Sequence, residues 1–319
     1  MEFEKTLQIG NIASVEKRLK RIFTDNNPNT NSLLDMLIAN GYTWHCGGMS
    51  DPFQPIEKKL GVTKELINVA NQFKIHILFS TKSNTVYDCD ITPDLHAFQL
   101  SITNVNDRTD IEPNVPSIQS RYDFYKQLKS DGFKVGIRVQ PFIPGVTDDD
   151  IIDMFHDADN FTIEGLKLVP QNKTHKDYLL SLTNLTSDDF TQMGLLNLKP
   201  EIRLKLYKPF IEKLKKYGIA FSVADNDLHQ IGTNFCCCGD ALINKSTPFN
   251  NTAMIKQYGI DYTKQQIDDV LQKCNIANCK CNQLFTSNRQ EGCITVQDFY
   301  DKRFSRKSSP FSPEFLYKL

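Results

Sequence analysis

Seven cysteines in the last third of the chain suggest a metal site. The chain has nine cysteines, and all but Cys46 and Cys89 lie from position 236 onward. In a reducing compartment such a cluster favours metal ligation over disulfides, and thiolates suit zinc or an iron–sulfur centre. The C-x4-C-x-C spacing near position 280 differs from the C-x2-C pairs typical of zinc sites. We predict an auxiliary iron–sulfur or zinc site with ligands among Cys236, Cys238, Cys274, Cys279 and Cys281; the alternative is a set of reduced thiols in a small subdomain.

A second segment, WHCGGMSDPFQPIEKKLG from Trp44, places two glycines, two prolines and an aspartate directly after an apolar run. A strand that ends on such a segment delivers backbone carbonyls and short polar side chains to one rim of a sheet. The segment therefore predicts a place where a small molecule is held. The alternative is a tight turn that needs glycine for its conformation alone.

Predicted strands and helices alternate along the chain around the glycine-rich segment. Apolar runs predict six strands, at 42–46, 75–80, 96–103, 134–140, 161–169 and 219–224. Helical spacing of apolar residues follows at 62–73 and 118–129. This order predicts an α/β fold with a parallel sheet, specifically a partial TIM-type (β/α) barrel with a cysteine-rich C-terminal appendage. A doubly wound sheet is the alternative, but no GxGxxG or P-loop motif supports it.

Three regions are predicted along the chain: a helical segment at 1–41, the barrel at 42–225 and the cysteine-rich region at 226–319. The polar, turn-rich stretch 171–198 is predicted to be a loop or irregular insertion. The run TDDDII predicts a helix start capped by Thr147. Pro209 is predicted to lie in the first turn of a helix that Gly218 ends.

Composition limits the partners and the compartment. The formal net charge of −1 argues against a global attraction to nucleic acid, although a local basic groove stays open as an alternative. No apolar stretch is long enough for a membrane span, and the N-terminal MEFEKTLQIG is charged, unlike a signal peptide. We predict a cytoplasmic protein without a membrane partner. No GxSxG hydrolase motif or paired-histidine zinc spacing occurs in the sequence.

Five blocks carry a family resemblance: GGMSDPFQPIE, ILFSTKS, LSITNVND, EPNVPSIQSRYDFYKQLKSDGFKVGIRVQPFIPGV and ADND…CCCG. In this order and spacing, from about residue 42 to residue 239, the chain resembles the radical S-adenosylmethionine (radical SAM) enzymes, and within them the spore photoproduct lyase-like branch. The resemblance implies a six-stranded partial barrel that holds a [4Fe-4S] cluster and S-adenosylmethionine (AdoMet) at the carboxyl ends of its strands. It also implies that a 5′-deoxyadenosyl radical, made from AdoMet by the reduced cluster, abstracts hydrogen from a substrate.

The resemblance implies that the glycine-rich segment binds AdoMet. Gly47 and Gly48 would let backbone carbonyls accept hydrogen bonds from the methionine amino group of AdoMet. Met49 stands where many family members carry glutamate. Ser50 and Asp51 would complete the AdoMet site, and helix capping is the alternative role for Asp51.

Later blocks supply the other AdoMet residues that the resemblance implies. Lys82 would meet the methionine carboxylate as a positive charge, and Ser101 would offer a hydroxyl from its strand. Arg138, on a strand expected to be mostly apolar, needs an acidic partner. That partner is either a carboxylate of AdoMet or substrate, or a structural acid such as Glu112.

The family's CxxxCxxC motif, which binds the catalytic cluster, does not occur in these 319 residues. Its place in the family order precedes residue 42. The sequence therefore predicts either a radical SAM-type enzyme whose cluster ligands come from a missing N-terminal segment or a partner chain, or a noncatalytic, metal-stabilised barrel that binds a ligand or a protein. The resemblance implies that photoproduct repair needs a hydrogen-donating cysteine near the glycine-rich segment, beside Ser50. Cys46 instead precedes the glycines and no cysteine follows them closely, so photoproduct repair is not expected.

Overall fold

A computed structural model of the chain describes residues 10–29, 33–48, 50–193 and 195–225, then 228, 231–234, 236 and 238–245, and the single residues 258 and 266. The described residues form two compact units. The first unit contains residues up to Ile102 together with Asn106–Ile137 and Ala241–Lys245. The second unit contains Thr103–Val105 and Arg138–Asp240. The region boundaries predicted after residues 41 and 225 stay predictions.

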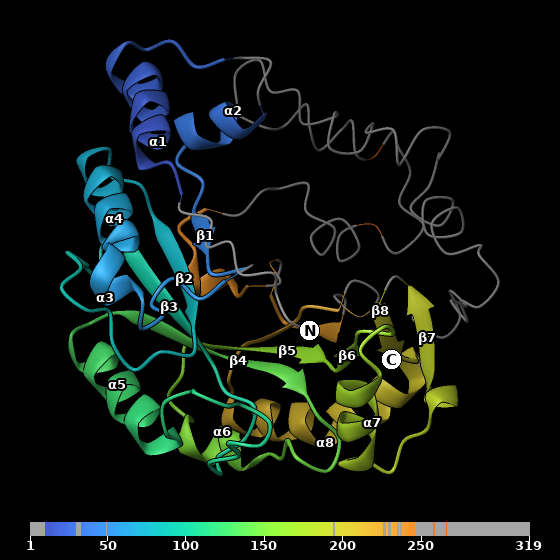
Figure 1. Ribbon diagram of the computed structural model, residues 1–319. Coiled ribbons are helices and arrows are strands. Elements are labelled where there is room, and N and C mark those ends of the chain that lie inside the picture. The colour runs from blue at the N-terminus through green and yellow to red at the C-terminus, as the bar shows by residue number, and fades with distance from the viewer. Residues whose placement is uncertain are drawn as a thin grey trace. The chain divides into compact units, whose positions relative to one another are not determined.

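Six strands form the main sheet, in the order β1-β2-β3-β4-β5-β9 (Figure 1). Their bounds are Trp44–Cys46, Ile77–Thr81, His96–Ser101, Lys134–Phe142, Asn160–Gly165 and Phe221–Val223. The pairs β1–β2, β2–β3 and β5–β9 are parallel. All six strands lie where the sequence predicted them, with ends shifted by a few residues, and the predicted parallel α/β class is confirmed.

Two helices of the first unit lie where apolar spacing predicted them, at 62–73 and 118–129. The described helices of this unit are α1 (Ile12–Leu19), a π-helical turn (Lys20–Thr24), α2 (Leu33–Ala39), α3 (Glu57–Leu60), α4 (Val62–Gln72) and α5 (Ile118–Ser130). In α4 the buried Ile67 and Ala70 lie at helical spacing. The side chain of Ser117 caps α5 by accepting the Ser120 N–H.

The core of the first unit is aromatic. Phe79 of β2 packs between Phe53 and Phe98, with ring centroids 5.2 and 5.5 Å away. Side chains alternate along a strand, so Phe79 and Thr81 share one face of β2 and Ser80 lies on the other. The strand is buried over its whole length, so Ser80 is a buried polar residue on the face that it shares with Leu78.

The second unit buries one face of β5 and β9 against α8 (Pro200–Tyr217). Phe161 of β5 meets Phe210 of α8 edge to face, and Phe142 of β4 contacts both Phe210 and Tyr207. Asn160, Thr162 and Glu164 alternate with these apolar residues and occupy the opposite face of β5. The second unit therefore has a buried polar face on its strands.

The stretch 171–198 differs from the sequence prediction, because it is largely regular structure. It contains α7 (Lys173–Ser181), a 3-10 turn (Ser187–Asp189) and the strands β7 (Phe190–Met193) and β8 (Leu195–Leu198). With β6 (Lys167–Leu168) these strands form a separate antiparallel sheet, in the order β6-β8-β7. The strand predicted at 161–169 is accordingly two strands of different sheets, with a break after Gly165.

Two local predictions are wrong. Thr147 does not cap the helix α6 (Asp150–Met154); its hydroxyl donates to the Thr103 carbonyl and accepts from the Ile143 N–H. Pro209 lies in the interior of α8, whose first residue is Pro200. Pro200 satisfies the preference for proline at a helix start, and Gly218 ends the helix with a φ of 69°, as predicted.

A search of the described helices for a segment both long and apolar enough to cross a bilayer finds none.

Candidate functional site

Asp51 ties the glycine-rich segment to the carboxyl end of β2. Its carboxylate accepts hydrogen bonds from the Thr81 hydroxyl (2.7 Å), the Lys82 N–H (2.6 Å) and the Phe53 N–H (2.9 Å). Short, charge-assisted bonds of this kind are among the stronger ones in proteins. Asp51 therefore fixes the backbone at Lys82, directly after β2. This role differs from the helix capping that was the alternative.

The first of the two glycines is required by packing within the chain. Gly47 has a φ of 112°, and a Cβ placed there would lie 2.1 Å from the backbone oxygen of Ser80. Gly48 is exposed, and the nearest atom to an added Cβ is the His45 Cε1 at 3.9 Å. The contact with β2 explains Gly47 without a ligand, whereas no contact within the described residues explains Gly48. Ser50 is exposed beside them, and Met49 lies outside the described residues.

Lys82 and Ser101, predicted from separate blocks, are joined by two intermediate side chains. The Lys82 ammonium pairs with Glu112, and the other oxygen of Glu112 lies 3.6 Å from the Arg121 guanidinium. Arg121 in turn donates to the Ser101 carbonyl at 3.0 Å. The carboxyl ends of β2 and β3 therefore share one charged cluster.

Arg121 is the most deeply buried member of this cluster. Its side chain is 5% exposed, and its Nε has no hydrogen-bond partner among the described residues. Burial lowers the pKa of the Arg121 guanidinium, although Glu112 and Asp107 oppose that shift. A buried donor without an acceptor is costly, so the Arg121 Nε is suited to donate a hydrogen bond to a ligand oxygen.

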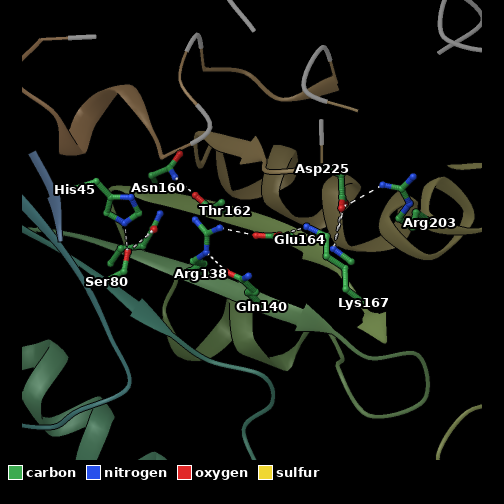
Figure 2. Close-up of polar contacts among 12 residues, drawn as sticks. His45, Ser80, Arg138, Gln140, Asn160, Thr162, Glu164, Lys167, Arg203 and Asp225 are labelled. Carbon is green, nitrogen blue, oxygen red and sulfur yellow. Dashed lines mark hydrogen bonds and ion pairs between the residues drawn. The ribbon is translucent and has the colours of Figure 1, made fainter. Parts of the chain in front are cut away.

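A polar chain that the sequence analysis missed crosses β1, β2 and β3. The Ser80 hydroxyl donates to the Gln99 Oε1 at 3.1 Å and lies 2.7 Å from the His45 Nε2. Because the Ser80 hydrogen is used on Gln99, His45 donates to Ser80 in this arrangement. Figure 2 shows His45 and Ser80 with this contact. Alternation of polar and apolar residues on the strands was the available signal.

Arg138 finds its acidic partner within the second unit. Its guanidinium pairs with Glu164 of β5 at 2.5 Å and donates from Nε to Gln140, two residues along β4. Lys167 of β6 pairs with the other oxygen of Glu164 (Figure 2). These partners satisfy the expectation that a strand arginine requires a carboxylate. A contact of Arg138 with AdoMet stays a prediction.

A second charged cluster in this unit is closed to solvent. Asp225, directly after β9, pairs with Arg203 at 3.2 Å, and both side chains are almost fully buried (Figure 2). Asp225 also accepts from the Tyr207 hydroxyl (2.7 Å) and from the Gly165 N–H (3.1 Å). A Cβ on Gly165 would lie 2.7 Å from the Tyr207 hydroxyl oxygen, so the chain there is tightly enclosed.

Cys236 and Cys238 are the two members of the predicted metal site that lie in the described part of the chain, where both are partly buried and form no disulfide with another described residue. The Cys236 carbonyl accepts from the Ser222 hydroxyl, and neighbouring Asn234 donates to Asn160, the first residue of β5. Asn160 and Glu164 are separated by about 13 Å of strand at 3.3 Å per residue. Cys236 therefore lies toward the amino end of β5, away from the carboxyl end that usually carries active sites in β/α folds.

The described residues contain no group of three or more histidine, cysteine or acidic side chains placed to hold a metal ion. Cys274, Cys279 and Cys281 lie outside the described residues, so the auxiliary metal site stays a prediction. Burial, with Asp51 and Glu57 nearby, raises the pKa of the Cys46 thiol to about 11. Cys46 is therefore a protonated thiol near neutral pH, a poor metal ligand and nucleophile.

Comparisons with known proteins give distant matches. No protein-family model matches the chain. Over 110 residues it is 31% identical to an uncharacterized protein of Methanocaldococcus jannaschii, a match that covers 33% of this chain and 42% of the relative. The chain thus spans less than half the length of this curated relative.

Among solved structures, the chain is similar to spore photoproduct lyase and to SuiB of Streptococcus suis. A lyase variant matches at 16% identity with a TM-score of 0.46, covering 67% of this chain and 66% of the lyase. The lyase complexed with a dinucleoside spore photoproduct matches at 15% identity with a TM-score of 0.43, covering 57% of this chain and 60% of that chain. SuiB bound to S-adenosylmethionine matches at 11% identity with a TM-score of 0.40, covering 68% of this chain and 44% of SuiB.

Proposed function

We propose that the first unit binds AdoMet at the carboxyl ends of β1, β2 and β3, as the AdoMet-binding part of a radical SAM-type enzyme. One observation carries the proposal: residues from three separate sequence blocks are linked by contacts, either directly or through Glu112 and Arg121. Gly47 packs on Ser80, Asp51 holds the Lys82 N–H, and Lys82 connects to Ser101. In parallel α/β folds, ligands bind at this end of the strands.

The donors and acceptors of the cluster suit the zwitterionic methionine group of AdoMet. In the proposal Lys82 pairs with the methionine carboxylate, and the unpartnered Arg121 Nε donates to one of its oxygens. Glu112 orients both cations by pairing with each. In the proposal the backbone carbonyls of Gly47 and Gly48 accept hydrogen bonds from the methionine ammonium. Asp51 keeps this segment in place.

The chemistry that AdoMet supplies beside a reduced [4Fe-4S] cluster is hydrogen-atom abstraction from a substrate. The sequence holds no CxxxCxxC motif, and the described residues hold no cysteine cluster that could replace it. The described residues therefore do not fit the catalytic cluster. In the proposal the ligands of the catalytic cluster come from another polypeptide segment, and the residues of this chain bind and orient AdoMet.

Binding of S-adenosylhomocysteine, which keeps the carboxylate and ammonium of AdoMet, tests the site. We expect saturable binding with one site per chain by isothermal titration calorimetry. Lys82→Ala should weaken it by about 10-fold or more, since a hydrogen bond to a charged group contributes about 1.5 to 3 kcal/mol. Lys59→Ala, which removes an exposed lysine from α3, is the matched control and should bind normally. No binding, or equal binding by both variants, would refute the proposal.

A second experiment tests the catalytic half of the proposal. After anaerobic reconstitution with iron and sulfide, followed by reduction, we expect this chain alone to release no 5′-deoxyadenosine from AdoMet. The reason is that the ligands of the catalytic cluster are not among its residues. Addition of a polypeptide that carries CxxxCxxC should start the release. Turnover by the chain alone would contradict the assignment, and continued inactivity with such a partner would favour the noncatalytic binding module.

A further inference from the structure

The charged cluster of β4, β5 and β6 in the second unit has the composition of an anion site. Two cations, Arg138 and Lys167, face the single carboxylate of Glu164, and each pairs with a different oxygen of it. Figure 2 shows the four side chains, including Gln140, gathered along neighbouring strands. Both oxygens of Glu164 are occupied, so this carboxylate holds the cations and is not poised to act as a base.

The Glu164 cluster differs from the neighbouring Asp225 cluster, which is a structural ion pair. The Arg203 and Asp225 side chains are 6% and 3% exposed, and the Asp225 carboxylate is already occupied by Arg203, the Tyr207 hydroxyl and the Gly165 N–H. The Lys167 side chain is 34% exposed. An ammonium has three N–H donors, and the described contacts of Lys167 use one of them, on Glu164. Lys167 therefore has donor capacity on a side that solvent reaches.

The cluster is also held rigidly. Glu164 precedes Gly165 and Lys167 follows it by two residues. The Gly165 N–H donates to Asp225, and Tyr207 and Arg203 enclose its Cα. The closed cluster thus fixes the turn from β5 into β6. A fixed backbone keeps the two cations in one arrangement before any ligand arrives, which lowers the entropic cost of binding.

We propose that Lys167, together with the more deeply buried Arg138, binds an oxyanionic group of the substrate, either a carboxylate or a phosphate. The oxyanion accepts hydrogen bonds from the Lys167 ammonium and lies in the positive field of both cations. Glu164 pairs with both cations and competes with the oxyanion for them. This site goes beyond the proposed AdoMet binding and does not depend on it.

Inorganic phosphate and acetate, titrated separately into the isotope-labelled full chain, test the proposal by NMR. We expect at least one of them to shift the amide signals of Gly165 and Lys167 saturably, while sodium chloride at matched ionic strength does not. Saturation by phosphate alone would indicate a phosphorylated substrate, and saturation by acetate would indicate a carboxylate. Shifts that follow ionic strength alone would overturn the proposal, because they would report screening rather than a site.

Variants make the assignment specific. Lys167→Gln should weaken phosphate or acetate binding by about 10-fold or more. Lys173→Gln, at an exposed lysine of α7, should not change it. Glu164→Gln removes the competing carboxylate and should bind the anion at least as tightly as the native chain. Equal binding by Lys167→Gln and the native chain, or loss of binding in Glu164→Gln, would overturn the proposal.

S-adenosylhomocysteine separates this site from the AdoMet site. Arg138→Gln should weaken phosphate or acetate binding and leave S-adenosylhomocysteine binding unchanged. If Arg138→Gln instead weakens S-adenosylhomocysteine binding and leaves anion binding unchanged, Arg138 belongs to the AdoMet site and the oxyanion proposal is overturned. Absence of S-adenosylhomocysteine binding, with anion binding intact, would refute the proposed function alone.

Discussion

Replacing Asp225 by asparagine is expected to lower the free energy of unfolding by about 3 to 5 kcal/mol, the usual cost of leaving one member of a buried ion pair without its partner. Asparagine has nearly the same shape as aspartate, so the change isolates the charge. Arg203 would be left as a buried cation without its carboxylate, and Tyr207 would lose an ionised acceptor. Urea unfolding followed by far-UV circular dichroism measures the effect.

An exposed ion pair of the same unit provides the control. Lys213 pairs with Asp153, whose side chain is 49% exposed. Exposed pairs contribute little to stability, so Asp153→Asn should not measurably move the urea midpoint. If both asparagine variants behave alike, the Asp225 cluster does not hold the turn between β5 and β6 in the way that the oxyanion site requires.

The two adjacent glycines should respond very differently to a single methyl group. Gly47→Ala is expected to cost about 3 kcal/mol or more, because it combines an unfavourable positive φ with a collision against the Ser80 carbonyl. The displaced segment carries Asp51, which holds the Lys82 N–H, so S-adenosylhomocysteine binding should fall as well. Unfolding and calorimetry on the same preparation measure both effects.

Gly48→Ala is the matched control for the fold and the sharper probe of the ligand. An added Cβ there makes only ordinary contact with His45, so stability should change by less than about 1 kcal/mol. Weaker S-adenosylhomocysteine binding by this stable variant would place the ligand against Gly48. Unchanged binding would show that the second glycine does not approach the ligand.

The sequence was sufficient to locate the main sheet because its strands are short apolar runs between turn residues. The separate sheet of β6, β7 and β8 was missed for a physical reason. Its strands carry exposed and half-exposed residues such as Leu195 and Asn197, and their pairing partners lie up to 30 residues apart. At the break after β5 the Gly165 N–H bonds Asp225, 60 residues downstream. The local periodicity of the sequence cannot predict such a distant contact.

The candidate site divides in the same way. Asp51, Lys82 and Ser101 were predicted because they stand at strand ends inside recognisable blocks. Their partners were harder to foresee. Glu112 is in a loop whose position only folding defines, and Glu164 looks like any polar residue on an alternating strand until Arg138 is placed opposite it. The direction of a side chain can be predicted from periodicity, but its partner across the sheet cannot.

The small segment Ala241–Lys245 belongs to the first unit although more than a hundred residues separate it from Ile137. Its Asn244 N–H bonds the Thr43 hydroxyl just before β1, and Lys245 lies over the ring of Tyr42. During synthesis on the ribosome, the stretch that leads into β1 must therefore wait for the whole second unit to emerge before its last contacts form. An expression fragment ending near residue 137 would leave Thr43 and Tyr42 without these partners, and a useful truncation has to retain residue 245.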